Sequence, residues 1–277
     1  MAQVIGTNVS SISAQRQLNQ TNTGLSTALE RLSSGLRINS AKDDAAGIAI
    51  ASRFTAQING FNQGVRNAQD AISLAQTAEG AINELSTNVQ RIRELAVQSA
   101  NATNSDTDRS ALQTEVAQLK AEIRRIVGGA EFNGKKILGS SAEQAQVFHV
   151  GANTTGDDTI TVNLTNLSTN TALTALSGGN INTSATATTT IGQADALLTI
   201  LNTERAKLGA VQNRFDSVVR AGEITVENLS ASRSRIQDAD FAKETANLTR
   251  FQILQQAGVS VLSQANALPQ SVLGLLG

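Results

Sequence analysis

The chain has 277 residues and a formal net charge of -1, with 16% charged residues, 3% aromatic residues and no cysteine. The missing cysteines exclude a disulfide framework, a thiol nucleophile and a cysteine-ligated metal site. The balanced charge argues against a basic nucleic-acid-binding surface. The sequence contains 40 alanines, a composition that favours long helices packed closely side by side.

The first residues of the chain are periodic but uncharged. Ile5, Val9 and Ile12 follow a helical spacing within residues 1–15, which carry no charged side chain. The same kind of spacing continues through Leu18, Leu25, Leu29 and Leu32. No basic segment precedes an apolar run here, so we expect no cleaved secretory signal. No run approaches 18 apolar residues, so we expect no transmembrane helix.

A long helix is predicted from about Ala45 to Gln98. Ser40 lies three residues before Asp43, and Asp44 follows, which predicts a capping-box-like start with acids at the positive helix end. Apolar or small residues then alternate at three and four, with one stammer-like slip at Ala78. At 1.5 Å per residue this helix would be roughly 80 Å long, which predicts a rod.

Two further segments show the same heptad spacing of apolar residues and are predicted to be helices. One runs through Leu112 and Ile126 to Gly128, and a tight turn is predicted at Asn133 and Gly134. The other lies beyond residue 192. We therefore predict a long antiparallel coiled-coil bundle formed by residues 45–139 and 192–238. Its expected core residues are Ile58, Val65, Ile82, Leu85, Leu119, Leu208 and Phe215.

The middle of the chain, residues 140–191, is polar. No lysine or arginine occurs between Lys136 and Arg205. Alternating apolar residues over 146–150 and 159–164 predict a short β-hairpin. The Ser/Thr-rich remainder is interpreted as a flexible surface loop.

The last residues repeat the pattern of the first. Residues 251–277 carry no charged side chain, and Pro269 is the only proline. Uncharged amphipathic helices are poorly stable alone in water. We expect the terminal segments, 1–44 and 239–277, to pair and to bind further copies of the chain. Membrane contact is the alternative, but helices at membrane surfaces usually carry Lys or Arg on their polar face.

Motifs for catalysis and cofactor binding are missing from the sequence. His149 is the only histidine, so a Ser-His-Asp triad or a two-histidine metal site cannot form within one chain. The pairs Asp43-Asp44 and Asp157-Asp158 fit a helix start and a turn better than a calcium site or acid–base pair. We predict no enzyme, no metal and no cofactor.

Several longer strings carry a family resemblance. They are ERLSSGLRINSAKDDAAGIAIA from Glu30, QRIRELAVQSAN from Gln90, FNGKKIL from Phe132 and SRIQDADFAKETANLTRFQILQQAGVSVLSQAN from Ser234. Over about residues 1–155 and 192–277, the chain resembles the bacterial flagellins.

This resemblance implies a structural subunit of the extracellular flagellar filament. It implies export in unfolded form by the flagellar type III apparatus, and terminal helices that pair as a coiled coil after assembly. The expected assembly residues are Ile5, Val9, Ile12, Leu18, Leu25, Phe251, Ile253, Val259 and Leu262. Only about 55 residues separate the two halves that resemble flagellins, which implies a thin filament without outer domains. The alternatives are a hook–filament junction protein and, in another class, a membrane-binding coiled-coil effector.

The resemblance also implies partners besides further copies of the chain. They are an export chaperone at Asp240–Gly277, hook-associated and cap proteins, and host receptors. The segment Glu30–Ala51 resembles the flagellin epitope perceived by plants. Arg91, Leu95 and Glu115 fall where the vertebrate flagellin receptor contacts similar chains. Neither nucleic-acid binding nor membrane insertion is expected.

Overall fold

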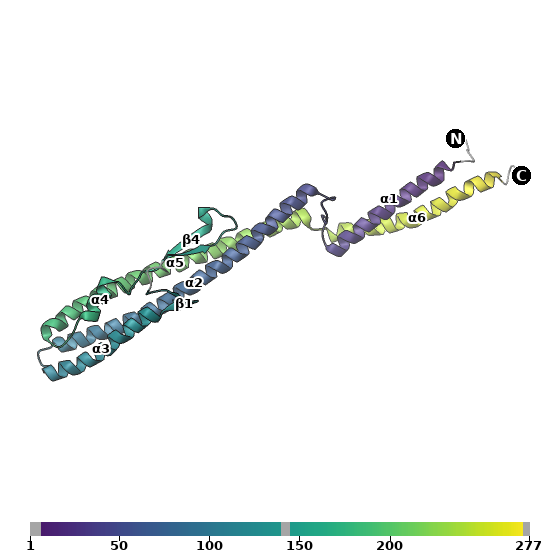
Figure 1. Cartoon of the computed structure of the whole chain (residues 1–277). Coiled ribbons are helices and arrows are strands. Elements are labelled where there is room, and N and C mark those ends of the chain that lie inside the picture. Colours follow the sequence, from purple (N-terminus) through teal and green to yellow (C-terminus); the bar gives the residue numbers. More distant parts are fainter. Residues whose placement is uncertain (1–6, 140–144, 274–277) are drawn as a thin grey trace. The chain divides into compact units, whose positions relative to one another are not determined.

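The computed structural model describes residues 7–139 and 145–273, with side chains described as far as residue 267. The predicted Ile5 lies outside these residues. The helices are α1 (Val9–Ser34), α2 (Ala45–Ala100), α3 (Asp106–Gly129), α4 (Thr171–Gly178), α5 (Ser184–Gln237) and α6 (Phe241–Leu273). The short strands are β1 (Glu131–Phe132), β2 (Lys135–Lys136), β3 (Ala145–His149) and β4 (Thr159–Asn163) (Figure 1). A mainly helical fold with a small antiparallel β region confirms the predicted fold class.

The chain divides into two compact units, which are described separately. The terminal unit comprises Met1–Ala56 and Asn228–Gly277, and the central unit comprises Gln57–Glu227. The unit boundaries therefore lie inside α2 and α5, whereas the predicted boundaries coincide with the helix ends near residues 44 and 239.

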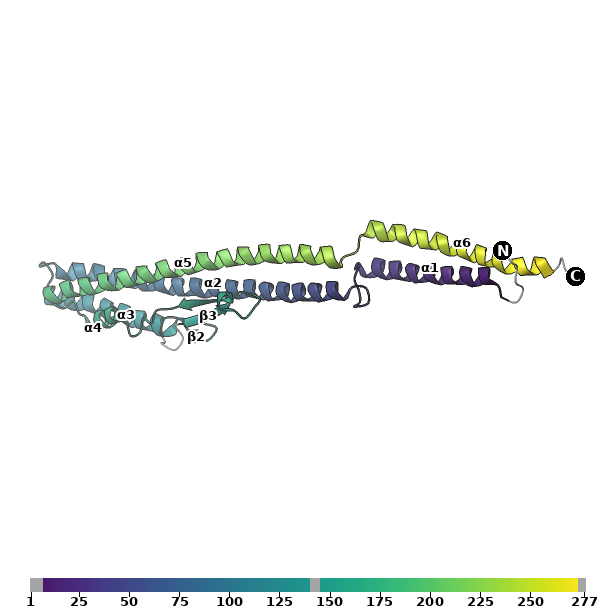
Figure 2. The same ribbon diagram turned by 90° about the horizontal axis from the view of Figure 1, so that it is seen from above.

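The central unit is built on two long antiparallel helices, α2 and α5. The Gln212 amide donates to Glu79 at 2.9 Å, and Arg93 pairs with Asp195 at 2.6 Å. Residue numbers thus fall along α5 as they rise along α2. Helix α3 packs beside them, joined to α2 by the ion pair Arg91–Glu115 at 2.8 Å (Figure 2).

The core of the central unit is made largely of alanine and branched aliphatic side chains. Ala68, Ala71, Ala75 and Ala78 on α2 are each 0% exposed. Such small residues let neighbouring helices approach closely, which explains the alanine-rich composition. Of the expected core residues, five are buried: Ile58, Ile82, Leu85, Leu208 and Phe215. Val65 and Leu119 are half-buried.

Helix α2 begins at the predicted Ala45, but its capping differs from the prediction. The Asp43 carboxylate accepts hydrogen bonds from the Ser40 amide at 2.9 Å and from the Asn39 amide at 3.1 Å, so it closes a turn before the helix. These backbone hydrogen bonds are the main cause of the lowered pKa of Asp43. Asp44 accepts from the Gly47 amide at 2.9 Å and acts as the N-cap. Reading Ser40 as the helix cap was therefore wrong.

The predicted hairpin is present, and a second one accompanies it. β3 pairs with β4 in antiparallel register, with Val147 opposite Thr161. At the predicted tight turn, Asn133 and Gly134 have positive φ values of 49° and 76° and join β1 to β2. Two positive φ values fit the type I′ turn, which Asn-Gly favours.

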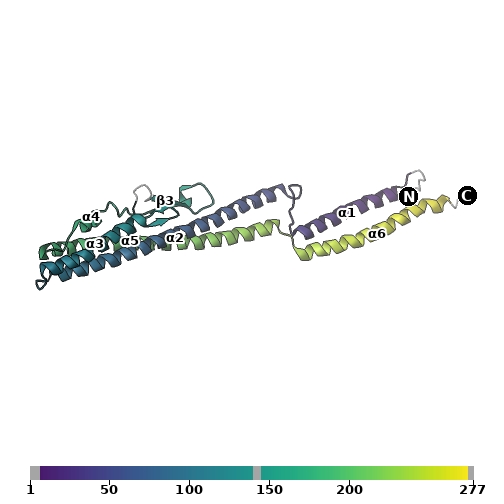
Figure 3. The same ribbon diagram turned by 60° about the horizontal axis from the view of Figure 1, so that its bottom comes forward.

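The interpretation of the Ser/Thr-rich segment as a loop was wrong. It contains the helix α4, capped by the Asn170 side chain, which accepts from the Ala172 amide at 2.9 Å. Apolar residues spaced along this segment are buried in the core of the central unit. They are Leu164, Leu167, Leu173, Leu176 and Ile181. These buried side chains fasten the segment onto the helical bundle. Figure 3 shows α4 lying alongside the long helices of the central unit.

Asp158 organises the turn between β3 and β4. Its carboxylate accepts from the Thr155 hydroxyl and, at 3.0 Å, from the Thr155 amide. The side-chain hydrogen bond from Thr155 is the main cause of the lowered pKa of Asp158. A carboxyl group whose pKa is lower in the folded state stabilises the fold above its unfolded pKa, and this contribution disappears as the pH falls through the folded pKa.

We therefore expect the β3–β4 turn to loosen below pH 3.8, the ordinary pKa of the group. The Asn153 amide also donates to the Asp158 carboxylate, at 3.4 Å. Amide hydrogen exchange at Asn153 and Thr155 should accelerate as the pH falls below 3.8, beyond the intrinsic pH dependence of exchange. Asp158→Asn should show faster exchange already at pH 5 and a weaker pH response. The neighbouring exposed Asp157→Asn serves as the control and should behave like the parent chain. Equal exchange in both variants would contradict the assignment.

Candidate assembly surface

The terminal unit pairs two segments from opposite ends of the chain. Helices α1 and α6 lie side by side in every view (Figures 1, 2 and 3). The Asn8 amide group donates to the Ala265 carbonyl at 2.8 Å, and Ser11 donates to Asn266 at 2.7 Å. The expectation that the terminal helices pair is confirmed.

Polar contacts fix the register along the rest of this helix pair. The Gln255 amide group donates to Asn22 at 3.0 Å. Arg31 pairs at 3.3 Å with Glu244, which is only 6% exposed. Because such bonds are directional, they favour one alignment of α1 against α6.

Small residues let larger apolar side chains cross between the two helices. A Cβ atom on Gly24 would lie 2.6 Å from the ring of Phe251, and one on Gly258 would lie 3.2 Å from Leu18. Both Phe251 and Leu18 are half-buried, as are the expected assembly residues Leu25 and Leu262. These four side chains contribute to the α1–α6 pair itself.

The four remaining expected assembly residues that the structure describes are exposed. Val9 is 64% exposed, Ile12 49%, Ile253 61% and Val259 55%. In contrast, the buried positions of the pair include polar and small residues, namely Ser11, Thr21, Ala28 and Ala265. The pair therefore has a polar and small-residue seam, and several of its large aliphatic side chains lie on the surface.

Further exposed apolar residues escaped the sequence interpretation. They are Phe241 at 57%, Leu254 at 41% and Val261 at 56% exposure. Their spacing does not follow the single seam that was sought, because α6 presents apolar groups on more than one face. We call the exposed apolar residues of α1 and α6 the terminal apolar surface: Val9, Ile12, Leu29, Phe241, Ile253, Leu254, Val259 and Val261.

Most of this surface lies in uncharged sequence. Val9 and Ile12 precede Arg16, the first charged residue, and Ile253, Leu254, Val259 and Val261 follow Arg250, the last, whereas Leu29 and Phe241 lie beside Glu30 and Asp240. The uncharged part does not oppose contact between copies. Exposed large apolar side chains gathered on one pair of helices indicate an interaction site. None of the helices in the described part of the chain is long and apolar enough to cross a membrane.

The expected receptor-contact residues lie on α2 and α3 of the central unit. Arg91 bridges Glu94 at 3.2 Å and Glu115 at 2.8 Å, and these hydrogen bonds raise its pKa, the bond to Glu115 most. The Arg91 and Glu115 side chains are 48% and 45% exposed. Leu95 is 1% exposed and belongs to the core. The structure thus brings together two surface side chains and places the third in the core.

The groups considered for chemistry are dispersed. His149 lies at the end of β3, and its carbonyl accepts from Asn67 at 2.7 Å. Within residues 7–139 and 145–273, no three His, Asp or Glu side chains are grouped as metal ligands.

Comparison with known proteins identifies the family of this helical chain. Residues 5–143 match the bacterial flagellin N-terminal helical region, and residues 191–276 match the bacterial flagellin C-terminal helical region. The chain belongs to the bacterial flagellin family. It is thus a structural subunit of the extracellular flagellar filament and associates with further copies of itself.

Whole-length relatives agree with this assignment. The chain is 43% identical over 273 residues to a flagellin of Halalkalibacterium halodurans, covering 99% of both chains. It is 44% identical over 316 residues to a flagellin of Xenorhabdus nematophila, covering 100% of both chains. It is 43% identical over 287 residues to the flagellar filament 33 kDa core protein of Treponema phagedenis, covering 99% of both chains.

A solved structure resembles part of this flagellin. The crystal structure of Bacillus cereus flagellin matches 57% of this chain and 88% of that chain, with 32% identity and a TM-score of 0.50. The alternatives of a hook–filament junction protein and a membrane-binding effector gain no support from these comparisons.

Proposed function

We propose that the terminal apolar surface is the main contact by which this flagellin polymerises. The observation that carries the proposal is the outward orientation of Val9, Ile12, Ile253 and Val259 around a polar seam. Fully burying an aliphatic side chain of this size stabilises a contact by about 1.5–3 kcal/mol. Several such side chains on each subunit would supply a strong drive for assembly.

The paired termini would form late, after the chain has left the cell. Hydrogen bonds such as Asn8–Ala265 and Ser11–Asn266 join residues at opposite ends of the sequence, so they require both ends to be present. This fits export of the unfolded chain through the flagellar type III apparatus. A chaperone would cover the segment Asp240–Gly277 before export, since its exposed apolar side chains favour aggregation. Hook-associated and cap proteins would bind the same kind of surface at the ends of the filament.

The filament would be thin and mechanical in function, without catalysis. Between the two halves, the described residues from 145 onward form the β3–β4 hairpin and the α4 segment, whose leucines are buried against the helical bundle. This arrangement supports a filament surface without protruding outer domains. Knob-like projections in electron micrographs would contradict it.

Host receptors would bind the central unit through contacts with Arg91 and Glu115. Leu95 would act indirectly, by holding α2 in the core, because it is 1% exposed. Arg91→Ala should raise the protein concentration needed for half-maximal activation of a vertebrate flagellin-receptor reporter by about tenfold, as expected for a contact worth 1–2 kcal/mol. Arg93→Ala, which removes the neighbouring exposed arginine, should leave it unchanged. A silent parent chain would reject the proposal, and so would equal effects of the two variants.

Recognition of Glu30–Ala51 by plants is a separate proposal, tested with the corresponding peptide.

Seeded polymerisation tests the assembly function. Filaments are dissociated by heat, cooled, and mixed with short filament seeds in the absence of lipid. We expect the seeds to elongate and the free monomer to fall to a fixed critical concentration. Liposome binding without filament growth would instead support a membrane-binding protein.

A further inference from the structure

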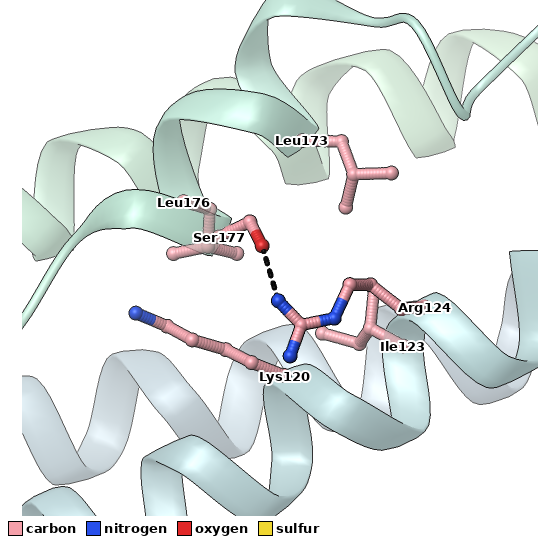
Figure 4. Close-up of a pocket in the computed structure, with 6 residues that line it drawn as sticks. All are labelled: Lys120, Ile123, Arg124, Leu173, Leu176 and Ser177. Carbon is pink, nitrogen blue, oxygen red and sulfur yellow. Dashed lines mark hydrogen bonds between the residues drawn. The ribbon is translucent and has the colours of Figure 1, made fainter.

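Two cationic side chains lie at a cleft between α3 and α4 in the central unit. Lys120 and Arg124 are one helical turn apart on α3, and both reach toward α4 (Figure 4). The Lys120 ammonium donates to the Gly179 carbonyl, and Lys120 is only 5% exposed. Arg124 donates to the Ser177 hydroxyl at 2.9 Å. Both therefore bind neutral oxygen atoms.

Among the residues that the structure describes, neither cation forms an ion pair. Within the described ranges, no carboxylate lies within 4.0 Å of the Lys120 or Arg124 nitrogens. The nearby Glu122 is engaged by Arg125, at 2.6 Å. Burial lowers the pKa of Lys120, and the positive charge of Arg124 lowers it further. The site thus carries uncompensated positive charge beside apolar surface.

The space that Lys120 lines is only about 10 Å³. A neighbouring cleft, lined by Arg124 but not by Lys120, has room for a small ligand. Its volume is about 320 Å³, and its lining combines apolar side chains with hydroxyl groups. The lining residues besides Arg124 and Ser177 are Val127, Gly128, Ser168, Leu173 and Thr174. A guanidinium group has five N–H donors in a planar fork that matches oxyanions, and Arg124 uses one of them on Ser177.

We propose that this cleft binds a small oxyanion of the phosphate or sulfate type. Arg124 is the direct ligand, the Ser177 hydroxyl is the neighbouring donor, and Lys120 adds attraction as a nearby charge. The apolar wall of Val127 and Leu173 strengthens this attraction, because it displaces water from one side of the ion. A bound anion would link α3 to α4 and stabilise the segment around Ser177 on the helical bundle. This role is independent of the terminal apolar surface.

Titration of the full-length monomer with inorganic phosphate tests the site. The ionic strength is held constant with chloride, and binding is followed by phosphorus NMR line broadening and by the thermal midpoint of unfolding. At phosphate tenfold above its dissociation constant, we expect the midpoint to rise by about 3 °C. Arg124→Gln should abolish both responses. Arg125→Gln removes the same charge one residue away, from a side chain that is 71% exposed, and should keep them.

Each alternative outcome is distinct. Equal responses in the two glutamine variants would show diffuse charge attraction and overturn the site. A parent chain that does not respond to 50 mM phosphate would overturn it as well. If Arg124→Gln instead raises the critical concentration for polymerisation and phosphate has no effect, a carboxylate of a neighbouring copy occupies the cleft and the small-ion proposal fails. Should Arg124→Gln fold poorly, Arg124→Lys is the second variant. It keeps the positive charge but lacks the planar guanidinium group, and it should weaken phosphate binding severalfold.

Discussion

Replacing Ile253 with aspartate should abolish filament growth and leave the soluble monomer folded. Ile253 is 61% exposed on α6, so the monomer loses little packing when it is replaced. In the proposed filament the same position is covered by another copy, where an unpaired carboxylate costs several kcal/mol in lost hydration. Because every subunit repeats the contact, we expect the critical concentration to rise by at least 100-fold, which corresponds to about 2.7 kcal/mol per added subunit.

The measurement combines seeded elongation with circular dichroism of the monomer. Ile253→Leu keeps the apolar character and serves as the matched control, and it should elongate seeds within a few-fold of the parent rate. The helical content and the thermal midpoint of both monomers should equal those of the parent chain. Growth of Ile253→Asp at the parent critical concentration would remove α6 from the assembly contact.

The long helices could be predicted because the apolar residues that they bury recur with a helical period. Residues such as Ile82, Leu85 and Val89 repeat at three and four positions and are all buried. The predicted limits of α2, Ala45 and Gln98, fall within two residues of the observed Ala45–Ala100. Heptad spacing is reliable here because the central unit buries these side chains within one chain.

Short elements were harder to predict because their stability comes from tertiary contacts. Helix α4 is flanked by Thr, Ser, Asn and Gly, and its Leu173 and Leu176 are too few to define a period. The strands β1 and β2 have two residues each, so only their Asn133-Gly134 turn was visible. The α2 cap shifted from Ser40 to Asp44 because Asp43 is bound by the preceding turn.

The terminal surface shows a different limit of sequence interpretation. Periodicity identified Val9, Ile12, Ile253 and Val259 but did not indicate whether they face α1, α6 or another copy. In the structure these four side chains are exposed, whereas Ser11 and Thr21 are buried. The missing charge at both ends was the better signal, since it marks regions that need not be kept apart from other copies.

Replacing Phe215 with alanine should produce the largest loss of stability within the central unit. Phe215 lies on α5 and is 0% exposed. The centroid of its ring lies 5.6 Å from that of Phe148 on β3, and the two ring planes are at 78° to each other. Removing a buried phenylalanine side chain costs about 3–5 kcal/mol through lost burial and the cavity left behind. We expect a comparable fall in the free energy of unfolding of the central unit, measured by urea titration of the monomer.

The aromatic contact makes this prediction specific to the packing of the hairpin on α5. Phe148→Ala should be destabilising on its own, and the double variant should lose about 0.5–1.5 kcal/mol less than the two single losses added together. Ile224→Ala, at a 58% exposed position on the same helix, should change stability by less than about 0.5 kcal/mol. Amide exchange along β3 and β4 should accelerate in Phe215→Ala, because the hairpin loses its aromatic anchor on α5. Additive losses with unchanged exchange in the hairpin would show that the two rings are not energetically coupled.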